Sequence, residues 1–270
     1  MIHDPAYITV NIPGRKESGF EVIFRDNPFM EGKDLGIVTI ASLTAEPFGN
    51  RVSRLAHVIL NLKDETLLPV DEVCRTWFRR YLDCSLKPLI TLYDQHGIAL
   101  EAHQQNSVLD ISEGYPSAYY YRDNQGFYLS ERYKHSLSQL APEAEGIVSL
   151  YYDDAEIRDR FSYYLVVNQV CSVISRMGSD GLIEEPELVN LLRDYLEALG
   201  SQLSGAGKDL VNALLTRKTI PAKGNLLTRL YDVDELEAEN EQAIYTQLVN
   251  PLTVMRKPDS MVEEVDFAVA

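Results

Sequence analysis

The sequence HGIALEAHQQNSVLDI at residues 96–111 places a polar segment between two short apolar runs. In IALEAH at 98–103, the apolar residues Ile98, Leu100 and Ala102 alternate with Glu101 and His103. Residues 107–111 form the second run. Such alternation is typical of half-buried β-strands. We therefore expect strand structure here. Glu101 and His103 should share a face, because residues two apart in a strand point the same way.

The neighbouring segments predict a helix before this stretch and a strand after it. In residues 71–95, apolar side chains recur at a spacing of about 3.6 residues, as in an amphipathic helix. His96-Gly97 is a suitable helix stop, and Pro88 is expected to kink or divide the helix. The tyrosine-rich run at 119–121 predicts another strand.

The two ends of the chain have different patterns. Residues 1–60 carry runs of Val, Ile and Phe at 20–24 and 36–43, bounded by Gly, Pro and Asn, and we expect them to be mostly β. After Leu150 the spacing becomes helical, with one long helix marked by apolar residues between 157 and 171.

Two more helices are expected towards the C-terminus. One starts near Pro186 and ends at Gly200, and the other covers about 208–217. The first carries an apolar stripe at helical spacing, which we expect to be core: Leu188, Leu191, Leu192, Tyr195 and Leu199.

These patterns predict an α+β class, with an antiparallel sheet in a β-rich front and a helical C-terminal part. We assign the β-rich portion to residues 1–150, the helical portion packed on it to 151–256, and a flexible tail to 257–270. The acidic tract at 232–241 is expected to be solvated.

Composition excludes several classes of function. The 270 residues include 25 Lys and Arg against 41 Asp and Glu, a formal charge of −16. Such a balance argues against nucleic acids and anionic membrane surfaces as partners, because both require clustered basic residues. A few basic residues in a cleft could still bind a small anion.

The cysteines and the N-terminus suggest a cytoplasmic protein. Cys74, Cys84 and Cys171 include no CxxC pair, which speaks against a disulfide framework or a zinc or iron–sulfur site. No apolar run approaches the ~20 residues of a membrane span. The sequence MIHDPAYITV lacks the features of a signal peptide.

The densest polar cluster is Glu101, His103, Gln104, Gln105 and Asn106. A carboxylate, an imidazole and amides at one strand end could hold a polar acid or a phosphate–metal assembly. The plainer interpretation is a strand end with a hydrogen-bonded histidine, and pattern alone favours it.

Three other sites are weaker signals. Asp123 follows the tyrosine-rich strand in RDNQG, where it could bind Mg²⁺ or simply form a turn. Arg25 in FRDNPF could clamp a carboxylate. In PAKGNLLTRL, Lys223 and Arg229 could approach phosphates or a carboxylate, but a solvated helix start explains them equally well. No P-loop or dinucleotide motif occurs.

Taken together, five segments resemble NRPS-independent siderophore synthetases of the IucA/IucC (aerobactin) type. They are FEVIFRDNPF, HGIALEAHQQN, RDNQG, VNQV and PAKGNLLTRL, and they occur in the family's order between about Phe20 and Pro251. The resemblance implies a cupped-hand fold in which this chain forms mainly the palm domain.

The resemblance also implies a ligase for siderophore biosynthesis and iron acquisition. ATP and a carboxylic acid such as citrate would give an acyl-adenylate and pyrophosphate, and an amine or hydroxylamine would then form the amide. By motif, His103 and Arg25 would hold the acid, and Gln104 or Gln105 would line the pocket. Glu101, Asn106 and Asp123 would hold Mg²⁺ on ATP, with Lys223 and Arg229 at the rim.

Family members are about twice this length, and their front half carries a histidine- and lysine-containing phosphate loop that residues 1–19 do not replace. The chain could therefore need a separate N-terminal half as partner, or be a non-catalytic carboxylate-binding fragment. The region also resembles FhuF-like ferric-siderophore reductases, but these use clustered C-terminal cysteines, and no cysteine follows Cys171.

Overall fold

The computed structural model describes residues 1–14, 19–29, 35–49, 51–123, 126–144, 146–147, 150–224 and 245–254. Its strands are β1 (Ala6–Thr9), β2 (Glu21–Phe24), β3 (Ile37–Thr39), β4 (Ile98–Leu100), β5 (Ser107–Asp110), β6 (Ala118–Tyr121), β7 (Phe127–Ser130), β8 (Tyr151–Tyr152), β9 (Thr219–Lys223) and β10 (Tyr245–Val249). Its α-helices are α1 (Ile40–Thr44), α2 (Arg54–Thr66), α3 (Val70–Tyr81), α4 (Lys87–His96), α5 (Lys134–Leu140), α6 (Asp154–Phe161), α7 (Cys171–Ser179), α8 (Glu185–Gly200), α9 (Ala206–Thr216) and α11 (Pro251–Val254).

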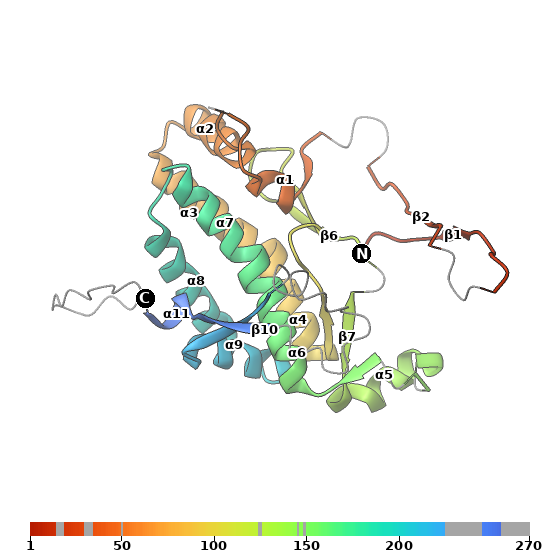
Figure 1. The fold of residues 1–270 in the computed structure, drawn as a ribbon. Helices are drawn as coiled ribbons and strands as arrows, with labels where there is room; N and C mark the ends of the chain where they lie inside the picture. The colour runs from red at the N-terminus through yellow and green to blue at the C-terminus, as the bar shows by residue number, and fades with distance from the viewer. Residues whose placement is uncertain are drawn as a thin grey trace.

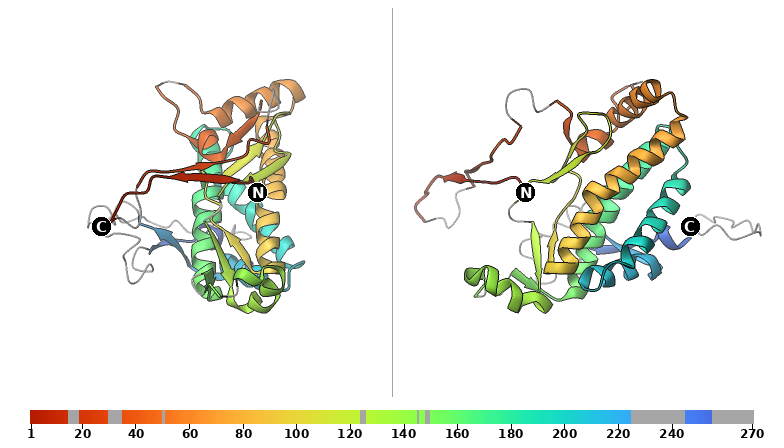
Figure 2. Two further views of the ribbon diagram at one scale, coloured as in Figure 1. Left: turned by 90° about the vertical axis from the view of Figure 1, so that its right-hand side faces the viewer. Right: turned by 180° about the vertical axis from the view of Figure 1, so that it is seen from behind.

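Two long helical rods cross the centre of the molecule and pack along each other (Figure 1; Figure 2, right). In each rod, two α-helices are joined by a π-helical segment: η1 (Leu82–Leu86) joins α3 to α4, and η5 (Ser162–Val170) joins α6 to α7. The predicted helices over 71–95 and 157–171 are thus confirmed. The division expected at Pro88 takes the form of η1, which ends directly before the first turn of α4.

Two three-stranded sheets lie beside the rods. One has the order β3-β5-β6 and is antiparallel, and the other has the order β4-β7-β8. In the second sheet, β4 pairs antiparallel with β7, whereas β7 and β8 are parallel. Antiparallel pairing prevails, and the expected α+β class is confirmed.

The front of the chain is more helical than the sequence suggested. The run at 36–43 gives a strand only as far as Thr39, whose side chain accepts from the Ser42 N–H and starts α1. The expectation of mostly β structure up to residue 60 is wrong from Arg54, where α2 begins. Ser53 caps α2 by accepting from the Ala56 N–H, and this cap is a common helix start.

The C-terminal helices cover the rods, as α4 contacts α9 and α8 contacts both α7 and α9. The predicted stripe of α8 is core: Leu188, Leu192 and Leu199 are buried, while Leu191 and Tyr195 pack against the same cluster. The helix expected over about 208–217 is α9, which ends at Thr216 with Arg217 as its C-cap. Lys223 ends a strand, β9, and does not start a helix. The acidic tract at 232–241 and the tail after 257 lie outside the described residues.

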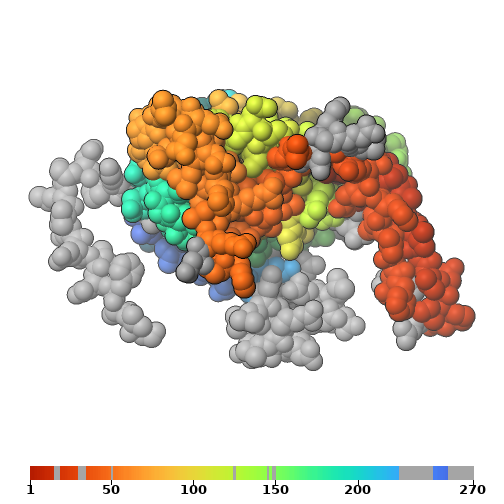
Figure 3. Space-filling model, turned by 90° about the horizontal axis from the view of Figure 1, so that it is seen from above, coloured from red at the N-terminus to blue at the C-terminus, as the bar shows by residue number. Residues whose placement is uncertain are grey.

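The antiparallel hairpin of β1 and β2 extends away from this body (Figures 1 and 3). Every residue of both strands is exposed, including Tyr7 at 72% and Phe24 at 48%. None of the described helices is long and apolar enough to cross a membrane.

Candidate functional site

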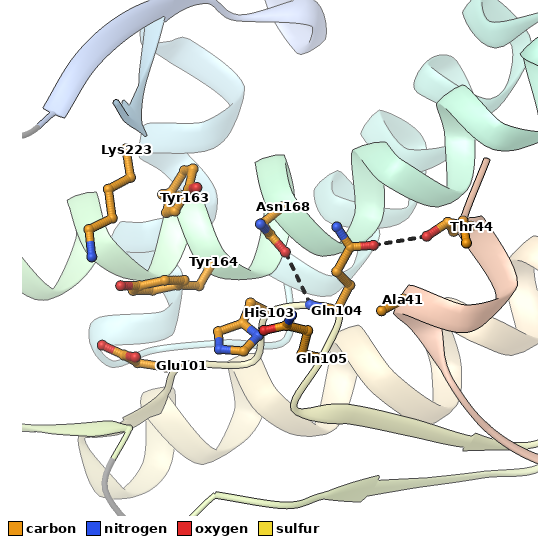
Figure 4. A pocket seen from close by; sticks show the side chains of 11 residues that line it. Ala41, Thr44, Glu101, His103, Gln104, Gln105, Tyr163, Tyr164, Asn168 and Lys223 are labelled. Atoms are coloured by element: carbon orange, nitrogen blue, oxygen red, sulfur yellow. Dashed lines mark hydrogen bonds between the residues drawn. The ribbon is translucent and has the colours of Figure 1, made fainter. Parts of the chain in front are cut away.

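A cleft of about 630 Å³ opens where the second rod, α1, the β4–β5 connection and β9 meet (Figure 4). This volume falls in the range of small-molecule sites. Its walls come from α1, the segment after β4, the π segment η5 and the end of β9. The lining residues are Ala41, Thr44, Ala45, Glu101, His103, Gln104, Gln105, Tyr163, Tyr164, Asn168 and Lys223.

Glu101 and His103 face the same cleft, as the sequence predicted, although β4 has already ended at Leu100. The Glu101 N–H donates to the Gly126 carbonyl at 2.7 Å, and the His103 N–H donates to the Glu101 carbonyl at 2.8 Å. Ala102 between them is fully buried. The buried methyl group anchors the backbone, and its two polar neighbours therefore turn towards the cleft.

The opposite wall is the π segment η5, which presents Tyr163, Tyr164 and Asn168. π-helical turns in proteins occur frequently at functional sites. The next residue, Gln169, is fully buried; it accepts from the Ser107 hydroxyl at 3.0 Å and donates to Tyr81 OH at 3.0 Å. The π segment is thereby fixed to both the sheet and the first rod.

Gln104 ties the two walls together. Its main-chain N–H donates to Asn168 Oδ1 at 3.1 Å, and its carbonyl accepts from the Ala41 N–H at 3.0 Å. Its side-chain Oε1 lies 2.9 Å from Thr44 Oγ1 (Figure 4). The position of this glutamine is therefore set by two different elements, α1 and η5.

The Glu101 carboxyl lies at the charged end of the cleft, and Tyr128 OH donates to it. Burial raises the pKa of this carboxyl, and Asp123 acts in the same direction. The hydrogen bond from Tyr128 and the charges of Lys223 and Arg160 oppose that rise in pKa. A cation bound nearby would favour the ionised form further.

His103 is half-buried, which favours the neutral form of its imidazole. Burial lowers the pKa of its imidazole, the charges of Arg122 and Lys223 lower it too, and Asp123 acts in the opposite sense. An imidazole with a pKa below its usual value of about 6.5 keeps one N–H donor and one acceptor nitrogen.

The residues proposed for Mg²⁺ lie together, but they do not all face the cleft. Asn106 Nδ2 donates to Asp123 Oδ2 at 2.8 Å. A Cβ added to Gly126 would lie 2.7 Å from Asp123 Oδ2 and 3.0 Å from Glu101 Cβ, which shows how closely both acids approach this glycine. Glu101 lines the polar cleft, whereas Asp123 lines a neighbouring, mainly apolar hollow.

Two carboxylates and an amide are oxygen donors of the kind that Mg²⁺ prefers, so these residues fit the ion chemically. Among the described residues, no group of His, Cys, Asp and Glu side chains could hold a metal by itself. Mg²⁺ commonly takes its remaining ligands from water and phosphates.

The basic residues predicted for the site lie in different parts of the molecule. Lys223 lines the cleft at the end of β9. Arg25 instead lies at the base of the hairpin, where Nε and Nη2 form a fork on Asp4 at 2.5 and 2.7 Å. This carboxylate raises the pKa of the Arg25 guanidinium, with a smaller contribution from Asp123. Arg229 falls outside the described residues.

Sequence reasoning assigned no role in the site to Thr44, Tyr163, Tyr164 or Asn168. The pair Asn168-Gln169 inside an otherwise apolar helix was the available signal, because buried amides in such a segment need partners. The local sequence around Thr44 contains no such signal, since its role depends on a contact with Gln104, sixty positions away.

Comparisons with known proteins identify the family of this chain. A family model described as "Ferric iron reductase FhuF-like transporter" matches residues 75–238. The chain is 44% identical over 253 residues to a spermidine-citrate ligase of Bacillus anthracis. This match covers 93% of this chain and 42% of the ligase. It is 37% identical to the rhizobactin siderophore biosynthesis protein RhbC of Rhizobium meliloti, covering 93% and 43%.

Among solved structures, ATP-bound aerobactin synthetase IucA of Klebsiella pneumoniae superimposes with a TM-score of 0.76 at 25% identity. The match covers 86% of this chain and 39% of that one. The chain thus spans about two fifths of the length of the relatives it matches. It belongs to the NRPS-independent siderophore synthetase family of the IucA/IucC type and contains the family's FhuF-like region.

Proposed function

We propose that this chain supplies the palm part of a siderophore synthetase that adenylates a citrate-like acid and joins it to an amine or hydroxylamine. The observation that carries the proposal is the cleft itself. It brings Glu101, His103 and Gln104 from one loop to Lys223, more than a hundred residues later. The names of the relatives, which include a spermidine-citrate ligase and an ATP-bound synthetase, support the reaction class.

In this proposal, His103 and the neighbouring amides bind the acid. The neutral imidazole can donate to a carboxylate oxygen, and Gln104 and Gln105 line the same wall. Arg25 would supply a planar fork for a second carboxylate. In the structure that fork is engaged by Asp4, so the acid would have to compete with this ion pair.

ATP binds at the charged end of the cleft in the proposed assembly. Glu101, Asn106 and Asp123 would hold Mg²⁺, and Lys223 and Arg229 would approach the phosphates. The ion would neutralise phosphate charge that otherwise repels the incoming acid. Lys223 contributes positive charge from the protein side and lies close enough to lower the pKa of Glu101.

The proposed chemistry has two displacements. A carboxylate oxygen of the acid attacks the α-phosphorus of ATP, and pyrophosphate leaves with the electron pair of the broken P–O bond. The amine nitrogen then attacks the acyl carbon, AMP leaves, and the nitrogen loses a proton, for which the acceptor nitrogen of His103 is available. Such reactions depend mainly on positioning and on electrostatic stabilisation. Use of the cellular ATP pool places them in the cytoplasm.

Two alternatives differ in what they require. A reductase of the FhuF type with a thiolate-bound iron–sulfur centre does not fit, because the chain has three cysteines and such centres commonly use four. A non-catalytic carboxylate-binding fragment is favoured by the coverage of about two fifths of the relatives.

The test is acid-dependent pyrophosphate release from the 270-residue chain with ATP, Mg²⁺ and citrate. We expect weak citrate binding and no turnover from the chain alone, and turnover when a separately expressed front half of a relative is added. His103→Ala should abolish that turnover. Robust turnover without the second protein would refute the requirement for a partner, and citrate binding without turnover in either mixture would support the fragment alternative.

A further inference from the structure

The cleft has two chemically different ends (Figure 4). Glu101 and Lys223 mark the charged end. The other end is neutral, and its polar side chains are those of Thr44, Gln104 and Asn168. The ring of His103 lies between the two ends.

The orientation of the Asn168 amide follows from its partner. The main-chain N–H of Gln104 can only donate, so the atom of Asn168 that it meets at 3.1 Å must be the oxygen, Oδ1. The NH₂ group therefore occupies the other branch of the amide. Asn168 thus keeps both N–H donors while its oxygen is committed to the loop.

The orientation of the Gln104 side chain follows from the single proton of the Thr44 hydroxyl. Two carbonyl oxygens lie near that hydroxyl, the Ile40 main-chain carbonyl at 3.0 Å and Gln104 Oε1 at 2.9 Å. In an α-helix, a carbonyl generally accepts already from the N–H four residues later. The Thr44 hydroxyl therefore donates its proton to Gln104 Oε1. The NH₂ group of the Gln104 amide then stays available as a donor.

Two oriented amides thus present N–H donors at one end of the cleft, while the oxygens of both amides are already engaged. Such a surface suits carboxylate and hydroxyl oxygens and disfavours an ammonium group, which is a donor itself. Neutral amides also discriminate by geometry, because a ligand that lacks a matching oxygen leaves buried donors unpaired.

We infer that Gln104 and Asn168 bind the non-reacting oxygen atoms of the acid, and that Thr44 is the positioning residue that fixes the Gln104 amide. The inference rests on the proposed function and adds a direction to it. The acid would lie with its inert oxygens at the amide end and its reacting carboxylate near His103, facing the ATP end.

The test is calorimetric titration of the 270-residue chain with citrate. Asn168→Asp keeps an oxygen for the Gln104 N–H, removes both donors and adds a negative charge, so citrate affinity should fall about tenfold or more. Asn190→Asp is the matched control, because Asn190 also uses its oxygen, to accept from Arg193 at 2.8 Å, and lies on α8. It should change affinity less than about twofold.

The positioning role of Thr44 is tested by two conservative substitutions, one that removes the hydroxyl and one that retains it. Thr44→Val removes the hydroxyl at nearly constant shape and should weaken citrate binding about threefold or more, because the Gln104 amide can then turn over. Thr44→Ser retains the hydroxyl and should restore affinity to within about twofold of the original. A merely structural role of Thr44 would lower the melting temperature without this split in citrate affinity.

The possible failures are distinguishable. Absence of citrate binding to the unaltered, folded chain would overturn the acid-binding function together with this inference. Citrate binding that is lost in His103→Ala but unchanged in Asn168→Asp would overturn the inference and leave the function standing. Tighter binding of spermidine to Asn168→Asp would also overturn it, since it would place the amine at the amide end.

Discussion

The cleft wall and the N-terminal hairpin both carry a residue proposed to bind the acid, and they hold it in different ways. His103 follows the fully buried Ala102 and faces a π segment that is fixed through the buried Gln169. Arg25 follows a strand whose residues are all exposed, and its guanidinium forms a fork on Asp4. The core preorganises the His103 half of the proposed acid clamp, whereas the Arg25 half depends on an ion pair at the base of the hairpin.

The cleft wall and the hairpin should contribute differently to the stability of the fold. An isolated two-stranded hairpin is marginally stable in water, because it has too few neighbours against which to bury its side chains. The cleft wall instead shares the main hydrophobic cluster with both rods. Substitutions should therefore affect stability strongly on the wall and weakly on the hairpin.

The largest effect should come from a matched pair of phenylalanines. Phe161 is the last residue of α6 and is 1% exposed, and its ring centroid lies 5.7 Å from that of Tyr93 in an edge-on contact. Phe161→Ala should therefore lower the free energy of unfolding by about 3–5 kcal/mol. Phe24→Ala in the hairpin should change it by about 0.5 kcal/mol or less. Urea unfolding checks both values, and equal losses would show that the hairpin is part of the cooperative core.

An intermediate loss of stability is expected for a substitution at Gly126, which lies between Glu101 and Asp123. A methyl group there would meet Asp123 Oδ2 at 2.7 Å and Tyr121 OH at 3.1 Å, so Gly126→Ala should cost about 1–3 kcal/mol by crowding. It should also weaken binding of Mg²⁺–ATP, which calorimetry can measure. Gly146→Ala is the control, since nothing lies within 4 Å of its added Cβ. Unchanged stability and nucleotide affinity in Gly126→Ala would argue against a metal site beside this glycine.

The smallest effect on stability is expected at Arg25. Its ion pair with Asp4 lies at the base of the hairpin, where the Arg25 side chain is 33% exposed and the Asp4 side chain 2% exposed, and we expect it to contribute about 1 kcal/mol, at the upper end of the range for surface pairs. Arg25→Ala should therefore lower the unfolding midpoint only slightly while weakening citrate binding. A stability loss as large as that of Phe161→Ala would contradict the comparison between the two regions.

Much of the fold could be predicted because its signals are local. The helix over 71–95 and the stripe of α8 follow from apolar spacing, which depends on each segment alone. Helix α2 was missed because its N-cap, Ser53, and its apolar positions follow a run that resembles strands. The side chain of Ser53 accepts from Ala56 N–H within the same segment, so the signal existed but was weaker than the strand pattern around it.

The candidate site was less predictable from the sequence than the fold. The motif EAHQQN identified Glu101, His103 and Gln104, and the structure brings these together with Lys223. It could not identify Thr44 or Asn168, because their orientation depends on the single contact that each makes with Gln104 across the cleft. The roles proposed for Arg25, Asn106, Asp123 and Arg229 stay predictions.

The π segment η5 also constrains how this part of the chain can change length. A π turn closes its hydrogen bonds over five residues instead of four, so a stretch of it can be shortened by one residue and still form a regular α-helix. Such a deletion would preserve a rod of nearly the same length and nearly the same orientation of α7 relative to α6, yet it would move the residues inside η5 around the helix axis. Asn168 and Gln169 would then exchange surroundings with their neighbours. The protein would keep a helix at this place and lose one wall of its cleft, so the number of residues here matters as much as their identity.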